Sequence, residues 1–77
     1  MIIANVTVKP VVNNGHKVSG SKIEYIFNVA TVEEAVERRF DHLQKWSGNA
    51  TKEIDENGVV TFTTPKFIEI WDDIVIQ

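Results

Sequence analysis

The chain has 77 residues, which suffices for one small domain with a single core and is too short for two. Hydrophobic residues make up 43% and charged residues 25%, near the globular average, so the composition argues against disorder. The absence of cysteine excludes disulfides and thiolate metal sites, and a net charge of -3 disfavours non-specific binding to nucleic-acid phosphates. We therefore predict one domain over residues 1–77.

The first part of the chain predicts two strands joined by a turn-rich segment. Residues 2–12 alternate with period two, starting with Ile2, Ala4 and Val6, and Pro10 ends or bends this strand. A second alternation covers residues 23–29, after a segment rich in Asn, Gly and Ser. We expect the two strands to pair as a long hairpin.

One helix is predicted over residues 32–46. Thr31 and Glu34 have the spacing of a capping box, in which the Thr31 hydroxyl accepts a hydrogen bond from the Glu34 amide. Gly48 is expected to end the helix. At about 100° per residue, six apolar residues fall on one stripe: Val32, Ala35, Val36, Phe40, Leu43 and Trp46.

Arg39 falls near the middle of this stripe and is its one departure from an apolar pattern. Either its aliphatic stem covers the sheet edge, or its guanidinium pairs with a sheet carboxylate such as Glu24 or Glu69. A contact with a partner molecule is the alternative, so Arg39 is also a candidate binding residue.

The remaining residues predict three short strands separated by turns. They cover residues 50–54, the neighbourhood of Val60 and Phe62, and residues 67–76, with a hairpin turn at residues 55–58. The order β-β-α-β-β-β predicts an α+β domain in which the single helix packs on an antiparallel sheet.

One helix can cover only one face of such a sheet. Ile70 and Trp71 are adjacent in the last strand and must face opposite ways, so some apolar surface needs another cover. We expect either a binding partner or a second copy of the chain, as a homodimer, to supply it.

The sequence offers no constellation for catalysis, and we predict a non-enzymatic protein without cofactor or metal. His16 and His42 have no carboxylate at a ligand spacing, and phosphate-binding and nucleophile motifs are lacking. No apolar run approaches the ~20 residues of a membrane helix, so we expect a cytoplasmic protein with no membrane partner.

Carboxylates supply most of the candidate binding residues. Glu33, Glu37 and Asp41 recur every four residues, so they line one helix face and could imitate nucleic-acid phosphates. The alternative is a solvated face relieved by salt bridges such as Asp41 to Lys45.

A second acidic group, Asp72 and Asp73, follows Trp71 in the last strand, where it marks an end or a bulge. These three residues form either a partner contact or, through the carboxylates, protection of an edge strand against aggregation.

Residues 23–54 comprise an alternating strand, the segment Val29-Ala30-Thr31-Val32-Glu33-Glu34-Ala35, an amphipathic helix, Gly48 and another strand. This part of the chain resembles small phage-encoded inhibitor proteins, both the inhibitor of bacterial RNA polymerase and anti-CRISPR proteins. The resemblance implies an inhibitor that binds a host protein or ribonucleoprotein complex in the host-cell cytoplasm.

Two other functions stay open at this point. A nucleic-acid-binding accessory protein would use the basic residues Lys9, Lys17 and Lys22 of the hairpin, against the unfavourable net charge. A structural module that assembles with copies of itself would use the uncovered sheet face.

Overall fold

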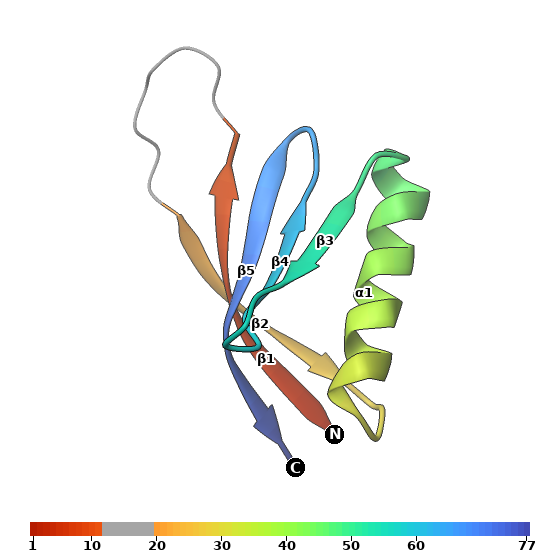
Figure 1. Cartoon of the computed structure of the whole chain (residues 1–77), viewed down its shortest axis with the longest axis vertical. Coiled ribbons are helices and arrows are strands. Elements are labelled where there is room, and N and C mark those ends of the chain that lie inside the picture. Colours follow the sequence, from red (N-terminus) through yellow and green to blue (C-terminus); the bar gives the residue numbers. More distant parts are fainter. Residues whose placement is uncertain (12–19) are drawn as a thin grey trace.

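The computed structural model describes residues 1–11 and 20–77. It contains five strands and one helix, in the predicted order β-β-α-β-β-β (Figure 1). These elements are β1 (Ile2–Pro10), β2 (Ser21–Phe27), α1 (Val32–Ser47), β3 (Thr51–Ile54), β4 (Val60–Thr63) and β5 (Phe67–Ile76). The predicted α+β class, with one helix and an antiparallel sheet, is confirmed.

The strands form one antiparallel sheet in the order β2-β1-β5-β4-β3. The predicted pairing of the first two strands is confirmed, although β1 ends at Pro10 instead of extending to residue 12. The predicted turn residues 13–19, with His16 and Lys17, lie outside the described part of the chain.

Local sequence signals define both ends of α1. The Thr31 hydroxyl accepts from the Glu34 amide at 3.2 Å, which satisfies an N–H group that the first helical turn leaves without an intrahelical partner. Gly48 adopts φ 72° and its amide donates to the Gln44 carbonyl, which ends the helix in the left-handed conformation that glycine tolerates. Both predicted caps are therefore confirmed.

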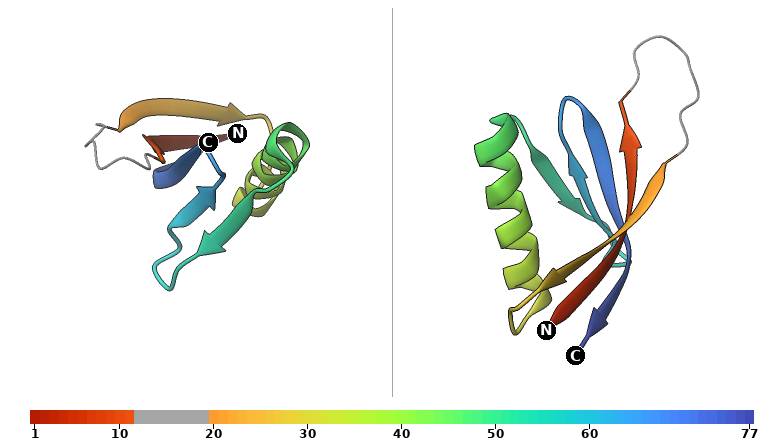
Figure 2. Two further views of the ribbon diagram at one scale, coloured as in Figure 1. Left: turned by 90° about the horizontal axis from the view of Figure 1, so that it is seen from above. Right: turned by 180° about the vertical axis from the view of Figure 1, so that it is seen from behind.

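The helix connects the two edge strands of the sheet, because it follows β2 and precedes β3. The sheet curves around it, so that β2 and β3 lie on either side of α1 (Figure 2). This arrangement leaves β1 and β5 in the centre, with one face against the helix and the other face uncovered.

The core lies between α1 and the covered face of the sheet. Its largest buried side chains are Trp71 and Phe62, whose ring centroids are 5.4 Å apart. Ala35, Val36 and Leu43 supply the buried positions of the helix. The stripe prediction therefore holds for these three, whereas Trp46, at its far end, is 58% exposed.

The register between paired strands shows which residues share the face of the sheet that the helix does not cover. Ile3 pairs with Ile26 of β2 and with Val75 of β5, so these three side chains form one apolar row across three strands. Ile70 lies on this face and Trp71 on the opposite one, as their adjacency predicts.

Candidate functional site

Arg39 is directed into the protein and contacts Glu69 of β5. Its Nε donates to Glu69 Oε1 at 3.1 Å, and its Nη2 donates to Glu69 Oε2 and, at 2.9 Å, to the Tyr25 hydroxyl. The Glu69 side chain is 1% exposed and that of Arg39 17%. The pairing of Arg39 with a sheet carboxylate is thus confirmed, with Glu69 as its partner.

The same network changes the acidity of its members. Burial, reinforced by the negative charge of Glu69, raises the pKa of Tyr25 to about 12. Burial opposes the charge on Arg39, but the hydrogen bonds and charge of Glu69 outweigh it and keep the Arg39 pKa above its ordinary value. The ion pair of Arg39 and Glu69 therefore holds the helix on the sheet, and the Arg39 guanidinium is used for contacts within the protein.

Trp71, a predicted partner contact, is 1% exposed and packs between Phe27 and Phe62. That prediction is corrected, because the side chain faces the helix and has no surface to offer. Its indole Nε1 is buried and has no hydrogen-bond partner within residues 1–11 and 20–77.

Asp72 lies at a β-bulge and Asp73 follows it, because the register of β1 and β5 shifts between Asn5 and Val6. Of the predicted end or bulge, the structure thus shows a bulge. Asp72 accepts hydrogen bonds from Thr7 and from Lys22, the latter at 3.0 Å. These two bonds lower the Asp72 pKa. Asp73 is exposed.

The role of these carboxylates in protecting a strand edge stays a prediction. The strand that carries them, β5, lies in the centre of the sheet between β1 and β4. Only its second half, beyond Trp71, has a side that β4 does not reach.

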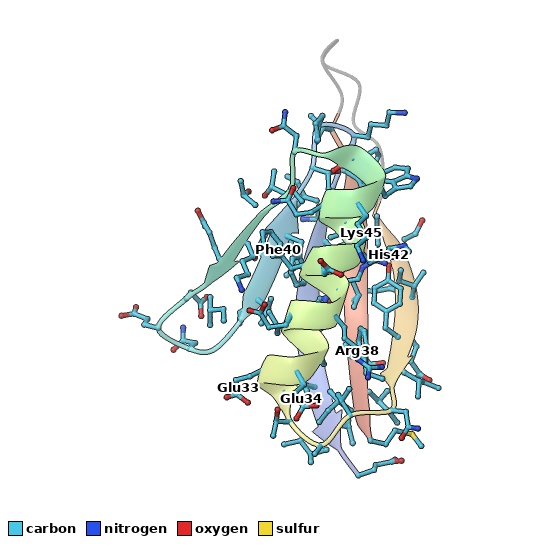
Figure 3. All side chains as sticks on the ribbon, turned by 90° about the vertical axis from the view of Figure 1, so that its right-hand side faces the viewer. Glu33, Glu34, Arg38, Phe40, His42 and Lys45 are labelled. Carbon is cyan, nitrogen blue, oxygen red and sulfur yellow. The ribbon has the colours of Figure 1, made fainter. Side chains whose placement is uncertain are left out.

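The acidic row on α1 is exposed but partly compensated. Glu37 pairs with Lys52 of β3, and Asp41 pairs with Lys45 at 3.1 Å. Glu33 lies at the first turn, whereas His42 and Lys45 lie further along the helix (Figure 3). Two of the three carboxylates therefore have a cation beside them, which weakens the row as an imitation of phosphates.

One surface feature, around Trp46, was not predicted from the sequence. Trp46 is exposed at the end of α1 and separates two hollows. One, of about 340 Å³, is lined by Trp46, Ser47, Thr64, Pro65 and Lys66, and the other, of about 160 Å³, is lined by Arg39, His42, Leu43, Trp46 and Phe67. We call these residues together the Trp46 surface.

Two contacts hold the Trp46 ring in place without covering it. The centroid of the Trp46 ring lies 5.7 Å from that of Phe67. Lys66 Nζ lies 5.9 Å from the centroid of the Trp46 ring, and Lys66 lines the larger of the two hollows. The only sequence signal was position, since Trp46 occupies the last turn of the helix. A fixed aromatic ring between two hollows, with a cation beside it, is suited to receive an apolar or acidic side chain.

The described residues bring no three His, Asp or Glu side chains together as a metal-binding group. Within the same residues, no helix is both long and apolar enough to cross a bilayer. Comparison with known proteins gives no match: no family model, no curated protein and no solved structure is significantly similar to this chain.

Proposed function

We propose that this chain is a non-enzymatic module that binds another protein, with Trp46 as the central contact. The observation that carries the proposal is the exposure of this indole, 58%, between two hollows. Tryptophan is strongly enriched among the residues that dominate binding energy, and such residues pair with pockets on or beside them.

The chemistry around the ring indicates the kind of partner. Lys66, Lys45 and His42 lie at this end of the molecule, so a partner segment with an apolar side chain next to a carboxylate would be complementary. In agreement with the resemblance of residues 23–54 to phage inhibitors, we propose that the partner is a bacterial host protein or ribonucleoprotein complex in the cytoplasm. Binding would inhibit that partner by occupying its surface.

The test compares binding by the wild-type protein and by Trp46→Ala. Ile54→Ala is a matched control, since Ile54 is 60% exposed and lies on β3. Affinity capture from a bacterial lysate with quantitative mass spectrometry should enrich one protein with the wild type and with Ile54→Ala, and lose it with Trp46→Ala. Retention of the same partner by Trp46→Ala would contradict the proposal.

Fluorescence provides an independent measurement with the purified partner. The chain has two tryptophans, and Trp71 is buried, so acrylamide quenching reports mainly on Trp46. Partner binding at the Trp46 surface should shift the emission to the blue and reduce quenching. Unchanged quenching in a saturated complex would place the contact elsewhere on the molecule.

The acidic row stays a prediction that the same binding measurement tests. Reversal of Glu33, Glu37 and Asp41 to lysine removes two ion pairs on the surface, and such pairs contribute about 0–1 kcal/mol each to stability. The variant should therefore fold. Loss of binding in this variant, but not in Trp46→Ala, would favour the imitation of phosphates, whereas direct binding of DNA by the wild type would favour the accessory-protein alternative.

A further inference from the structure

The second half of β5 has a free backbone edge. β5 pairs with β1 from Phe67 to Ile76, apart from the bulge residue Asp72, but it pairs with β4 only from Ile68 to Trp71. On the side of β4, residues 72–76 therefore have no backbone partner among the described residues. In Figure 1 this half-strand extends beyond β4 next to the start of β1.

This free edge differs in chemistry from the two outer edges of the sheet. β3 has only four residues and includes Lys52 and Glu53, and β2 includes Lys22 and Glu24. Charged side chains and short length are the usual means by which an edge avoids pairing with another strand. The β5 edge, by contrast, continues after Asp73 as Ile74-Val75-Ile76, with Ile76 69% and Val75 38% exposed.

The alternation of hydrogen-bond direction along β5 shows which backbone groups point to the free edge. The Gln77 amide donates to the Met1 carbonyl at 2.8 Å, so the backbone groups of Gln77 point to the start of β1. Because these directions alternate along an antiparallel strand, Val75 also points to β1. Ile74 and Ile76 then direct their N–H and C=O groups to the free edge.

We propose that a second copy of this chain adds its own β5 to this edge, antiparallel about a two-fold axis at Val75. In this register Ile74 of one copy lies opposite Ile76 of the other, and both present outward backbone groups, which gives four hydrogen bonds across the axis. Val75 lies opposite its own copy, and Asp73 lies opposite Gln77. No carboxylate side chain lies opposite another carboxylate side chain.

Registers with the axis shifted towards Asp73 are excluded by charge or by space. An axis at Asp73 would place two Asp73 side chains directly opposite each other, which is unfavourable. An axis at Ile74 would place Gln77 of the second copy opposite Trp71, where Val60 of β4 already pairs. Asp72 and Asp73 thus limit the pairing to the apolar end of the strand.

The Val75 register also continues the apolar row of the uncovered face. Ile26, Ile3 and Val75 form this row within one chain, and pairing at Val75 joins it to the same row of the second copy. The result is a ten-stranded sheet in which six β-branched side chains lie side by side. The complementarity of the strand with itself is what favours a second copy over an unrelated peptide.

A cysteine variant tests this register directly, because the chain has no cysteine of its own. In an antiparallel pair without direct hydrogen bonds, opposite Cα atoms lie about 4.5 Å apart, within the range of about 4.4–6.8 Å that a disulfide spans. Val75→Cys should therefore form a disulfide-linked dimer rapidly under mild oxidation. Ile26→Cys is the matched control, because it lies in the same row and is more exposed, at 61%, but is far from the axis.

Sedimentation equilibrium on the chain without cysteine provides the second measurement. An interface this short is smaller than the ~1,200 Å² of stable complexes, so the wild type should dimerise increasingly as its concentration approaches about 1 mM. Val75→Lys should stay monomeric, whereas Ile26→Lys and Trp46→Ala should dimerise like the wild type. Retention of the dimer by Trp46→Ala would show that this contact is independent of the proposed partner site.

Three results would overturn the proposal: a wild type that is monomeric at every concentration, equal oxidation rates for Val75→Cys and Ile26→Cys, or normal dimerisation of Val75→Lys. Thermal unfolding of each variant separates loss of pairing from loss of folding.

Discussion

Arg39 of α1 and Glu69 of β5 form an ion pair in the middle of the interface between the helix and the sheet, with the Glu69 side chain 1% exposed. Tyr25 of β2 completes the contact, since its hydroxyl receives from Arg39 and its ring lies 4.5 Å from the Arg39 Cζ. The helix and two strands of the sheet thus meet at this ion pair.

Removal of either charge alone should destabilise the fold. Arg39→Met leaves the Glu69 carboxylate buried without its cation, and the expected loss in the free energy of unfolding is about 3–5 kcal/mol. The double variant Arg39→Met/Glu69→Leu should recover most of this loss, because no unpaired charge remains. Urea denaturation of both variants measures it, and a single variant as stable as the wild type would show that the pair contributes little.

Tyr25 should lose its proton at a higher pH than a free tyrosine, and the protein should lose stability over the same pH range. It is the only tyrosine, so absorbance at alkaline pH reports on it alone, with an expected pKa of about 12 in the folded protein. Because the unfolded value is about 10, folding favours the neutral phenol, and stability should fall as the pH rises from about 10 through 12. Glu69→Gln should lower the Tyr25 pKa, and an unchanged value would assign the whole effect to burial.

Thr7→Val should raise the Asp72 pKa towards its ordinary value. The Thr7 hydroxyl and Lys22 both donate to this carboxylate and together lower its pKa. A lowered pKa stabilises the fold at neutral pH, and the contribution is lost as the pH falls through the folded value. Carboxyl ¹³C NMR across an acid titration measures the shift. Equal Asp72 titration in Thr7→Val and the wild type would leave Lys22 as the sole cause.

Phe62→Ala should cost more than Phe40→Ala. Phe62 is fully buried against Trp71, so its truncation should cost about 3–5 kcal/mol. Phe40 is only half-buried and lies under Lys52 Nζ, 5.0 Å from the ring centroid, so the expected loss is clearly smaller. Parallel thermal and chemical denaturation compare the two. Equal losses in the free energy of unfolding would show that Phe40 of α1 contributes to the core as much as Phe62 does.

The sequence predicted those parts of the fold that depend on neighbouring residues. The Thr31 and Glu34 cap, the Gly48 stop and the turn at residues 55–58 each need only a few adjacent side chains. The strand order is different, since the central position of β5 depends on contacts with β1 that no local pattern encodes. For this reason the sequence did not predict the strand order, and the edge-protecting role of Asp72 and Asp73 stays a prediction.

The same distinction between local signals and long-range contacts applies to the candidate binding residues. Arg39 broke the apolar stripe, and this anomaly correctly pointed to an internal carboxylate, but Glu24 and Glu69 could not be distinguished without the register. Trp46 obeyed the stripe, and its exposure could not be read from the pattern. Whether a helical position is covered depends on how far the sheet extends beneath it, and periodicity alone contains no such information.

The central position of β5 also has a consequence for the time at which this chain can fold. Thr7 and Asp72, which meet across the two middle strands, are 65 positions apart, and β5 is the strand that joins the β1–β2 hairpin to the β3–β4 hairpin. During synthesis on the ribosome, neither hairpin has the strand it needs until residues 67–76 emerge. Closure of so long a loop is slow. Nascent chains should therefore remain sensitive to protease until translation has passed β5, and a chain stopped before residue 67 should yield two separate hairpins and no core.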